Sequence, residues 1–361
     1  MAEETRKRKA EHIKICLEHK TQAQKTTTGF EDIHLVHRAL PEVDREKIEL
    51  STTVFGHELA APLTVSAMTG GTEEATKING AIAEAIEKLG LGMGVGSQRA
   101  AIENKELSKT FTIARKKAPN AFIMANIGAV QLVHGYGINE VKKAVEMIDA
   151  DALAIHLNAM QEAVQPEGQT SFKGVLAKIG ELAGKLDKPV IVKETGAGIA
   201  AEQARELEAA GVAAIDVGGL GGTSFAAVEH FRAEEEEKRL LADAFWDWGI
   251  PTAVSLVEVT QTVKIPVIAS GGLRSGTDLA KVLALNACLA SIAQPVLKAA
   301  VRSAKETEKV ISRFVEELRN VMFLVGARNV KALGKMPLVI GGTTAEWLVT
   351  RGFRVEDYAR R

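Results

Sequence analysis

Short runs of apolar and β-branched residues recur eight times along this chain, and a segment with helical spacing follows each run. Strands that alternate with helices pair in parallel through right-handed crossovers. Eight such units within about 240 residues match the size of a (β/α)8 TIM barrel. An open, doubly wound sheet is the structural alternative, although about five or six strands are more usual for it. The expected strands are residues 63–67, 92–95, 122–126, 152–157, 190–193, 214–217, 267–270 and 288–292.

The rest of the 361 residues is expected to extend this barrel rather than to form a second domain. Residues 1–61 form an N-terminal extension, with a charged helix over Arg6–Lys20 and an irregular stretch over Thr26–Leu59. Residues 62–303 form the barrel, and residues 304–361 form a C-terminal helical tail packed on it. The predicted helices are residues 74–89, 106–117, 138–148, 173–186, 200–210, 251–263, 276–285, 295–304 and 306–324.

Two loops are longer than a barrel needs. Residues 158–172 follow the fourth predicted strand, and residues 218–250 follow the sixth. Loops of this length in compact domains are usually functional or disordered. The second loop contains the acidic run Glu234–Glu237, to which the sequence assigns no role.

Charge and cysteine content exclude several classes of protein. With 45 Lys and Arg against 46 Asp and Glu, the net charge is −1, which argues against a nucleic-acid-binding protein. Cys16 and Cys288 lie far apart without the spacing of a metal site, which indicates a reducing compartment. The sequence shows no signal peptide and no run of about 18 apolar residues, so a cytoplasmic protein without a membrane partner is expected.

Polar or glycine-rich clusters follow almost every predicted strand, and a barrel brings these strand ends to one rim, where active sites lie. The turns at residues 218–222 and 271–272 can bind phosphate through bare backbone N–H groups, aided by the helix that opens near Thr277. Either turn alone is better explained as a tight connection between strand and helix. Together, on adjacent strands, they favour a phosphate-bearing cofactor.

Lys193 ends the apolar strand PVIVK and is expected to face the barrel mouth. There it could form a Schiff base, hold a phosphate or balance the charge of an anionic cofactor ring. A lysine that only extends toward solvent from the strand end is the alternative. The buried run before Lys193 and the presence of Glu194 after it favour a functional role.

His156, Asn158, Gln161 and Glu162 form the densest polar cluster in the sequence. Glu162 is a candidate Mg²⁺ ligand, because Mg²⁺ binds one or two carboxylates together with substrate phosphates. Ordinary polar residues on a loop helix are the alternative. The sequence contains no zinc-binding motif, nucleophile elbow or P-loop.

The basic run Arg6–Lys9, followed by His12, can be a solvated helix end. Its functional interpretation is a diphosphate clamp that folds over the barrel mouth, since Arg and Lys are natural phosphate partners.

Taken together, these motifs resemble the type 2, FMN-dependent isopentenyl-diphosphate isomerases over nearly the whole chain and in the same order. The HLNxxQE and AMTGG motifs are specific in combination, whereas the SGG turn is shared by many FMN barrels. The matching pieces are Arg8-Lys9-x-x-His12-Ile13, Thr28-Gly29-Phe30-Glu31-Asp32, Ala67-Met68-Thr69-Gly70-Gly71, Gly96-Ser97-Gln98-Arg99, Ala125-Asn126-Ile127-Gly128, His156-Leu157-Asn158-x-x-Gln161-Glu162, Pro166-Glu167-Gly168, Val192-Lys193-Glu194, Gly221-Gly222-Thr223-Ser224, Trp248-Gly249-Ile250, Ala269-Ser270-Gly271-Gly272-Leu273 and Gly326-Ala327-Arg328.

The resemblance implies a cytoplasmic homo-oligomer, a tetramer or octamer, that interconverts isopentenyl and dimethylallyl diphosphate without net redox change. It also implies reduced FMN, Mg²⁺ held by Glu162, NAD(P)H as reductant, and the small isoprenoid diphosphate as partner. Gln161, near the isoprenoid carbons, and His156 would be catalytic. Expected FMN contacts are Ala67, Met68, Thr69, Ser97, Asn126, Lys193, Thr223, Gly271, Gly272, Ala293 and Gln294. Expected substrate contacts are Arg8, Lys9, His12, Ser97, Gln98, Arg99, His156, Asn158 and Gln161.

Elementary chemistry is compatible with this assignment. Moving a double bond needs a proton added at one carbon and removed from another, in a dry apolar pocket. The sequence offers no matched pair of carboxylates at the rim, so we hypothesise that N5 of the reduced flavin is the acid/base centre. Gln161 and His156 would then orient the reacting groups, and Glu229 is a weaker acid/base candidate.

Two other functions stay open. An FMN-dependent oxidoreductase of the 2-hydroxy-acid oxidase type would carry a His in the turn after strand six or seven, and residues 217–222 contain none. A non-catalytic flavin- or phosphate-binding barrel would not need both a diphosphate clamp and the Gln161-Glu162 pair.

Near the eighth strand the sequence departs from the family pattern, because Asn286 and Ser291 replace glycines. Asn tolerates positive φ, so Asn286 is expected to keep the turn. Ser291 is expected to add a side chain where the backbone approaches the FMN phosphate.

Overall fold

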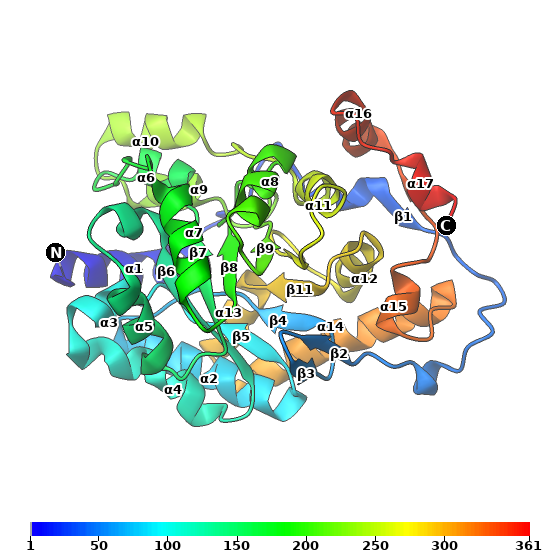
Figure 1. The fold of residues 1–361 in the computed structure, drawn as a ribbon, viewed down its shortest axis with the longest axis horizontal. Helices are drawn as coiled ribbons and strands as arrows, with labels where there is room; N and C mark the ends of the chain where they lie inside the picture. Colours follow the sequence, from blue (N-terminus) through cyan, green and yellow to red (C-terminus); the bar gives the residue numbers. More distant parts are fainter. Residues whose placement is uncertain (1) are drawn as a thin grey trace.

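Eight parallel strands close into a barrel, which confirms the predicted fold class. The computed structural model describes residues 2–361, with side chains from residue 7 onward, so the Arg6 side chain of the predicted basic run lies outside this part. The barrel strands follow one another in chain order (Figure 1), and each predicted run contains one of them, except that β6 continues two residues beyond its predicted end. They are β4 (Leu63–Val65), β5 (Gly92–Gly94), β6 (Phe122–Gly128), β7 (Ala152–His156), β8 (Val190–Lys193), β9 (Ala214–Asp216), β10 (Val267–Ala269) and β11 (Leu289–Ile292).

The side chains of each barrel strand alternate between the interior and the surrounding helices, as the pleat of a strand requires. On β8, Ile191 belongs to the small apolar cluster inside the barrel, whereas Val192 belongs to the larger core that includes the helices. The strand register also sets His156 beside Lys193, and Lys193 beside Asp216. Three polar groups on neighbouring strands therefore come together at the carboxyl end of the barrel.

Helix α2 (Glu73–Leu89) illustrates how the sequence bounds the outer helices. The Thr72 hydroxyl accepts a hydrogen bond from the Ala75 N–H, and Gly90 ends the helix with a φ of 64°. Ile78, Ile82 and other apolar residues at helical spacing are buried against the barrel. The other helices of the barrel region are α3 (Arg99–Glu103), α4 (Lys109–Lys117), α5 (Ile138–Met147), α6 (Ala159–Val164), α7 (Val175–Lys185), α8 (Ala201–Ala209), α9 (Phe225–Arg232), α10 (Glu236–Ala244), α11 (Thr252–Thr260), α12 (Gly276–Ala284) and α13 (Gln294–Ala300).

The N-terminal and C-terminal extensions meet in a two-stranded sheet. Strand β1 (Ile33–Leu35) pairs antiparallel with β12 (Leu338–Ile340), and β2 (Thr52–Val54) forms a hairpin with β3 (His57–Leu59). The expectation that residues 26–59 are irregular is therefore wrong in part. A three-residue strand has too short a pattern to be recognised, and the partner of β1 lies at the other end of the chain.

Helices at both chain ends complete the fold. Helix α1 (Ala2–Glu18) lies far from the C-terminal helices α16 (Gly342–Thr350) and α17 (Glu356–Ala359) in the view of Figure 1. The long helix α14 (Ala304–Val325) packs against α2 and α12, and α15 (Val330–Leu333) follows it. Within residues 2–361, none of the helices combines the length and the apolar character that a membrane span requires.

Asn286 stands in the turn between α12 and β11 with a φ of 71°, so the expected positive φ is confirmed. We predict that Asn286→Val lowers the free energy of unfolding by about 1–3 kcal/mol, because a β-branched residue is strained in this region. Asn286→Gly is the matched control and is expected to cost less. Urea denaturation measures both, and equal losses in the two variants would contradict the assignment of strain.

Candidate active site

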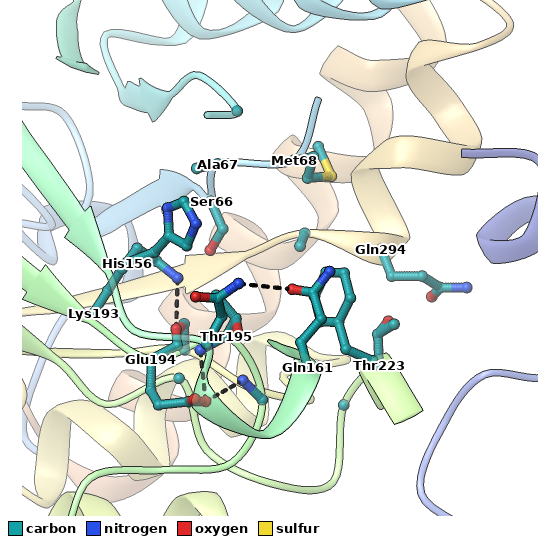
Figure 2. A pocket seen from close by; sticks show the side chains of 18 of the residues that line it. Ser66, Ala67, Met68, His156, Gln161, Lys193, Glu194, Thr195, Thr223 and Gln294 are labelled. Atoms are coloured by element: carbon teal, nitrogen blue, oxygen red, sulfur yellow. Dashed lines mark hydrogen bonds between the residues drawn. The ribbon is translucent and has the colours of Figure 1, made fainter. Parts of the chain in front are cut away.

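A cavity of about 280 Å³ opens at the carboxyl ends of the barrel strands. Its size is near the lower end of ligand-binding cavities, which span about 300–1,000 Å³. Side chains from several strand ends converge on it (Figure 2). Every site residue expected from the sequence lines this cavity except Gln98 and the weaker acid/base candidate Glu229. The lining includes Arg8, Lys9, His12, Ala67, Met68, Thr69, Ser97, Arg99, Asn126, His156, Asn158, Gln161, Glu162, Lys193, Thr223, Gly271, Gly272, Ala293 and Gln294.

Lys193 and Glu194 form one wall of the cavity, and both are buried. The Lys193 ammonium donates a hydrogen bond of 2.6 Å to the Glu194 carbonyl. The Glu194 carboxylate accepts three backbone N–H groups, from Thr195, Gly196 and Ala197, at 2.5–2.7 Å. Burial nevertheless raises the pKa of Glu194 to about 7. The side chain of Glu194 is thus used to shape the loop after β8, while Lys193 presents its charge to the cavity.

His156 is a neutral imidazole in this site. Loss of solvation lowers the pKa of His156 to about 3, and the nearby charges of Lys193 and Lys9 act in the same direction. Its Nδ1 atom lies 2.7 Å from Oδ1 of Asn126, which fixes the ring orientation. His156 can therefore orient a ligand by hydrogen bonding, but it does not carry the extra proton of an imidazolium acid at neutral pH.

Gln98 does not support the predicted substrate contact. Its side chain is fully buried, and its Nε2 donates to the Ala144 carbonyl at 2.7 Å. Its Oε1 accepts the Asn126 N–H at 2.9 Å. The side-chain amide is thus bonded to backbone at both ends. Gln98 holds Asn126, and Asn126 in turn holds His156.

The cluster at the start of α6 is organised around the Glu162 carboxylate, which is 8% exposed. Its Oε1 accepts from Nδ2 of Asn158 at 2.9 Å, and its Oε2 accepts from the Gln169 N–H at 2.7 Å. Asn158 also donates to Oε1 of Gln161 at 3.3 Å. No group of three or more His, Cys, Asp or Glu side chains within the described residues could hold a metal ion. Any Mg²⁺ here would need ligands from a bound phosphate in addition to Glu162.

Helix α1 brings its basic residues into the cavity wall. The Lys9 ammonium donates to the Ser97 carbonyl at 2.7 Å and lies 5.4 Å from the centre of the Phe111 ring. Loss of solvation, together with the charges of Arg8 and Arg99, lowers the pKa of Lys9 to about 7. Three cations concentrated in one place make this part of the cavity a site for an anion.

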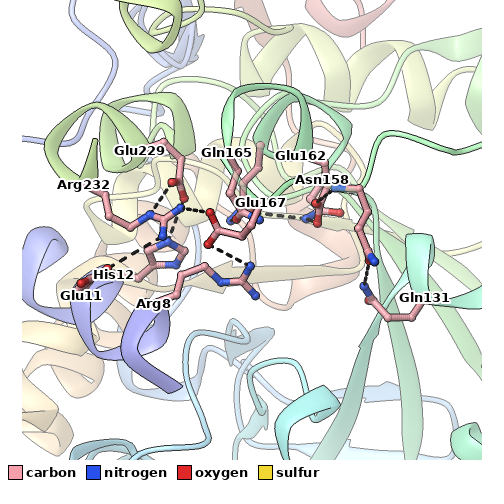
Figure 3. Close-up of polar contacts among 12 residues, drawn as sticks. Arg8, Glu11, His12, Gln131, Asn158, Glu162, Gln165, Glu167, Glu229 and Arg232 are labelled. Carbon is pink, nitrogen blue, oxygen red and sulfur yellow. Dashed lines mark hydrogen bonds and ion pairs between the residues drawn. The ribbon is translucent and has the colours of Figure 1, made fainter. Parts of the chain in front are cut away.

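A chain of charged side chains fastens α1 to α9 (Figure 3). Arg232 donates to Glu229 at 2.7 Å and to Glu167 at 2.6 Å. On α1, His12 bonds Glu229 at 2.9 Å, and Arg8 forms a looser ion pair with Glu167 at 3.6 Å. Glu229 is buried and does not line the cavity. The chain therefore holds the basic helix over the mouth while leaving Arg8 free to exchange its partner for an anion.

The segment that follows α1, residues 21–28, is called the strap here, and it crosses the rim beside the glycine-rich turns. The Ala23 N–H donates to the Gly222 carbonyl, and the Ser224 N–H donates to the Thr21 carbonyl. The Asp247 carboxylate accepts three consecutive strap N–H groups, those of residues 24–26, at 2.8–3.1 Å. The strap thereby joins the basic helix α1 to the loop that contains the glycine-rich turn at residues 218–222.

The turn at Gly271 and Gly272 requires glycine for two reasons. Their φ angles are 106° and 75°, and a Cβ on Gly272 would lie 2.4 Å from the Thr28 side chain. These demands exist without any ligand, although both residues also line the cavity. Arg274, which the sequence analysis missed, lines the cavity beside them. A cation two residues after an SGG turn was the available signal.

Ser291, the serine on the eighth strand that replaces a glycine of the family pattern, directs its hydroxyl toward two other hydroxyl groups. Its hydroxyl lies 3.0 Å from that of Thr64 and 2.7 Å from that of Ser66, inside the barrel. The side chain is thus bonded to residues on and just after the adjacent strand β4, and Ser291 also lines the cavity.

Two buried polar atoms of the cavity residues, Oγ1 of Thr69 and Oδ1 of Asn158, have no hydrogen-bond partner among the described side chains and backbone. Buried polar atoms are normally bonded, so these two indicate a ligand that supplies the missing groups. Lys193 offers an ammonium at the strand ends, and Arg274 with the glycine turn offers a phosphate position. The donor set fits a flavin mononucleotide.

The family model of the FMN-dependent dehydrogenases matches residues 1–113 and 129–339. The chain is 51% identical, over 98% of its length and 99% of the relative, to an isopentenyl-diphosphate delta-isomerase of Methanothermobacter thermautotrophicus. It is 49% identical, over 97% and 96%, to one of Pyrococcus abyssi. The chain belongs to the FMN-dependent dehydrogenase family, and within it to the isopentenyl-diphosphate delta-isomerases.

Solved structures of mandelate oxidase share the fold. One with (S)-2-phenylpropionate has a TM-score of 0.62 and 18% sequence identity, covering 94% of this chain and 98% of that one. Another, with 3,3-difluoro-2-hydroxy-3-phenylpropionic acid, has a TM-score of 0.60 and 16% identity, covering 94% and 99%. At this identity the likeness concerns the barrel architecture alone.

The lowered pKa of Lys9 predicts that anion binding depends on pH. Above pH 7 the ammonium is partly deprotonated, and a bound anion draws a proton back to it. Binding of inorganic pyrophosphate should therefore weaken from pH 7 to pH 9 and take up close to one proton, measured by calorimetry in buffers of different ionisation enthalpy. Lys9→Met should remove the proton uptake. The exposed Lys7 on the same helix is the control, and Lys7→Met should leave it unchanged; proton uptake that persists in Lys9→Met contradicts the prediction.

Proposed function

We propose that this protein interconverts isopentenyl and dimethylallyl diphosphate in isoprenoid biosynthesis, with bound FMN and Mg²⁺ and no net redox change. Relatives at about half identity over almost the whole chain carry that activity in their names. The single structural observation that carries the proposal is that two anion-binding regions line the same cavity. A basic helix faces glycine-rich turns and a buried lysine across it.

Lys193, Thr69, the Gly271–Gly272 turn and Arg274 would hold FMN. When bound in its reduced form, FMN would supply the atom that gives and takes the proton. The chain's own task is then to bind, orient and exclude water. Neutral His156 can orient the substrate without competing for a proton, because its pKa is about 3. Gln161, half-buried at the mouth, is placed to hold the reacting isoprenoid carbons.

The diphosphate would be bound by Arg8, Lys9 and Arg99. Glu162 and oxygens of the diphosphate would together hold Mg²⁺. The Glu162 and Lys9 side chains are both held by hydrogen bonds in the structure. Asn158 and the Gln169 N–H fix the Glu162 carboxylate, and Ser97 fixes the Lys9 ammonium. Fixed dipoles and charges of this kind bind a multiply charged anion with little reorganisation. We further propose NAD(P)H as the reductant and a homo-oligomeric state.

An FMN-dependent oxidation of a 2-hydroxy acid is less well supported. That reaction needs a base that takes a proton from the substrate carbon. Among the described residues, His12 and His156 line this cavity. The pKa of His156 is about 3, the His12 ring is bonded to the Glu229 carboxylate at 2.9 Å, and the turn at residues 217–222 has no histidine. The two activities also differ in stoichiometry, since only the oxidation consumes an oxidant with each turnover.

An anaerobic assay tests the proposal. The purified protein is examined for a flavin spectrum, reduced with NADPH, and supplied with isopentenyl diphosphate and Mg²⁺. We expect dimethylallyl diphosphate to form over many turnovers without further NADPH consumption. Product formation in proportion to NADPH would support an oxidoreductase instead. Absence of both bound flavin and isomerisation would overturn the proposal.

Glu162→Gln tests the metal site. The substitution keeps the shape of the side chain and removes its charge, so FMN should remain bound. The rate should fall on the order of 100-fold, equivalent to about 2.7 kcal/mol of activation free energy. The response to added Mg²⁺ should also weaken. Glu181→Gln, on the exposed face of α7, is the matched control and should change neither quantity. A wild-type Mg²⁺ response in Glu162→Gln would remove Glu162 from the metal site.

A further inference from the structure

A second cavity, of about 10 Å³, lies deeper inside the barrel. It is lined by residues that lie below the rim on the barrel strands, among them Gly94, Ala154 and Ile191. Four residues line both cavities, so the two spaces adjoin there: Ser66, Ala67, Lys193 and Ser291. A cavity of this size holds about one water molecule, provided that two to four polar groups face it.

Lys193 presents unused hydrogen-bond donors to this space. An ammonium has three N–H donors, and that of Lys193 makes one bond, to the Glu194 carbonyl. In the part of the chain that the structure describes, no carboxylate forms a direct ion pair with it within 4.0 Å. A buried ammonium with so few partners is costly unless other acceptors reach it.

Asp216 is the complementary group on the neighbouring strand. The register of β8 and β9 sets Lys193 beside Asp216, and both line the small cavity. The Asp216 side chain uses its Oδ1 atom to accept from the Ser270 hydroxyl at 2.5 Å and from the Gly218 N–H at 3.4 Å. Burial raises the pKa of this carboxyl, while the charge of Lys193 lowers it. Two opposite charges therefore face one space of the size of a water molecule without touching.

We propose that one water molecule in this cavity bridges the Lys193 ammonium and the Asp216 carboxylate. Through this bridge Asp216 partly neutralises the positive charge that Lys193 presents to the flavin. Asp216 is thus a positioning residue that acts through Lys193. The inference rests on the proposed binding of FMN. Within the barrel, charges interact more strongly than in water, so a partly neutralised Lys193 attracts an electron-rich reduced ring less than a free one does.

A redox titration of FMN-loaded Asp216→Asn tests this role. The substitution preserves shape and removes the negative charge. Reduced FMN should then bind about tenfold more tightly relative to oxidised FMN, which is an upward shift of about 30 mV for a two-electron couple. In the Lys193→Met background, the same substitution should shift the ratio by less than about threefold. An unchanged potential in Asp216→Asn, or a full shift in the Lys193→Met background, would overturn the proposal.

The bridging water has its own test, which leaves every charge in place. Ala154→Val adds two methyl groups to a residue that lines the small cavity and not the large one. It should raise the flavin potential as Asp216→Asn does. Ala152→Val is the matched control, since Ala152 is buried inside the barrel but lines neither cavity. Equal potentials in the two variants would refute the bridge. Failure of the wild-type protein to bind FMN would instead refute the proposed function.

Discussion

Closure of the eight-stranded barrel is the constraint on which the whole site depends. A parallel barrel brings the carboxyl end of every strand to one rim, so residues far apart in sequence must share one small space. His156, Lys193 and Asp216 are neighbours for this reason alone. Their crowding explains the unusual chemistry of the cavity. Where water is excluded, charged groups shift the pKa values of their neighbours. This keeps His156 neutral and favours the binding of an anion beside Lys9 and Lys193.

The extensions turn this rim into an enclosed site. Helix α1 contributes cations, and a chain of alternating charges through Arg232 holds it in place. The strap then couples that helix to the glycine-rich turns on the other side of the cavity. The regions proposed for substrate and cofactor are thus parts of one hydrogen-bonded unit. A substitution that loosens the strap should therefore alter binding in both regions.

Sequence patterns were sufficient for the barrel and for most of the cavity lining. Most barrel strands lie in runs rich in apolar residues, and burial on both faces makes such runs easy to recognise. Motifs at strand ends then located the lining, because topology fixes where strand ends go. Gln98 does not line the cavity, although it stands between two cavity residues, Ser97 and Arg99, because its side chain turns away into the core. Motif membership does not reveal side-chain direction.

Other features depend on contacts that no local pattern contains. The pairing of β1 with β12, the three strap N–H groups on Asp247 and the space between Lys193 and Asp216 arise only when distant segments meet.

The position of the two chain ends has a practical consequence. Helix α1 starts at Ala2 and lines the cavity only two turns later, whereas the C-terminal helices lie on the far side of the molecule (Figure 1). A purification tag or fusion partner attached at the N-terminus would lie close to the entrance of the cavity. An acidic tag would compete with anionic ligands for the basic residues of α1. Attachment at the C-terminus leaves that entrance clear.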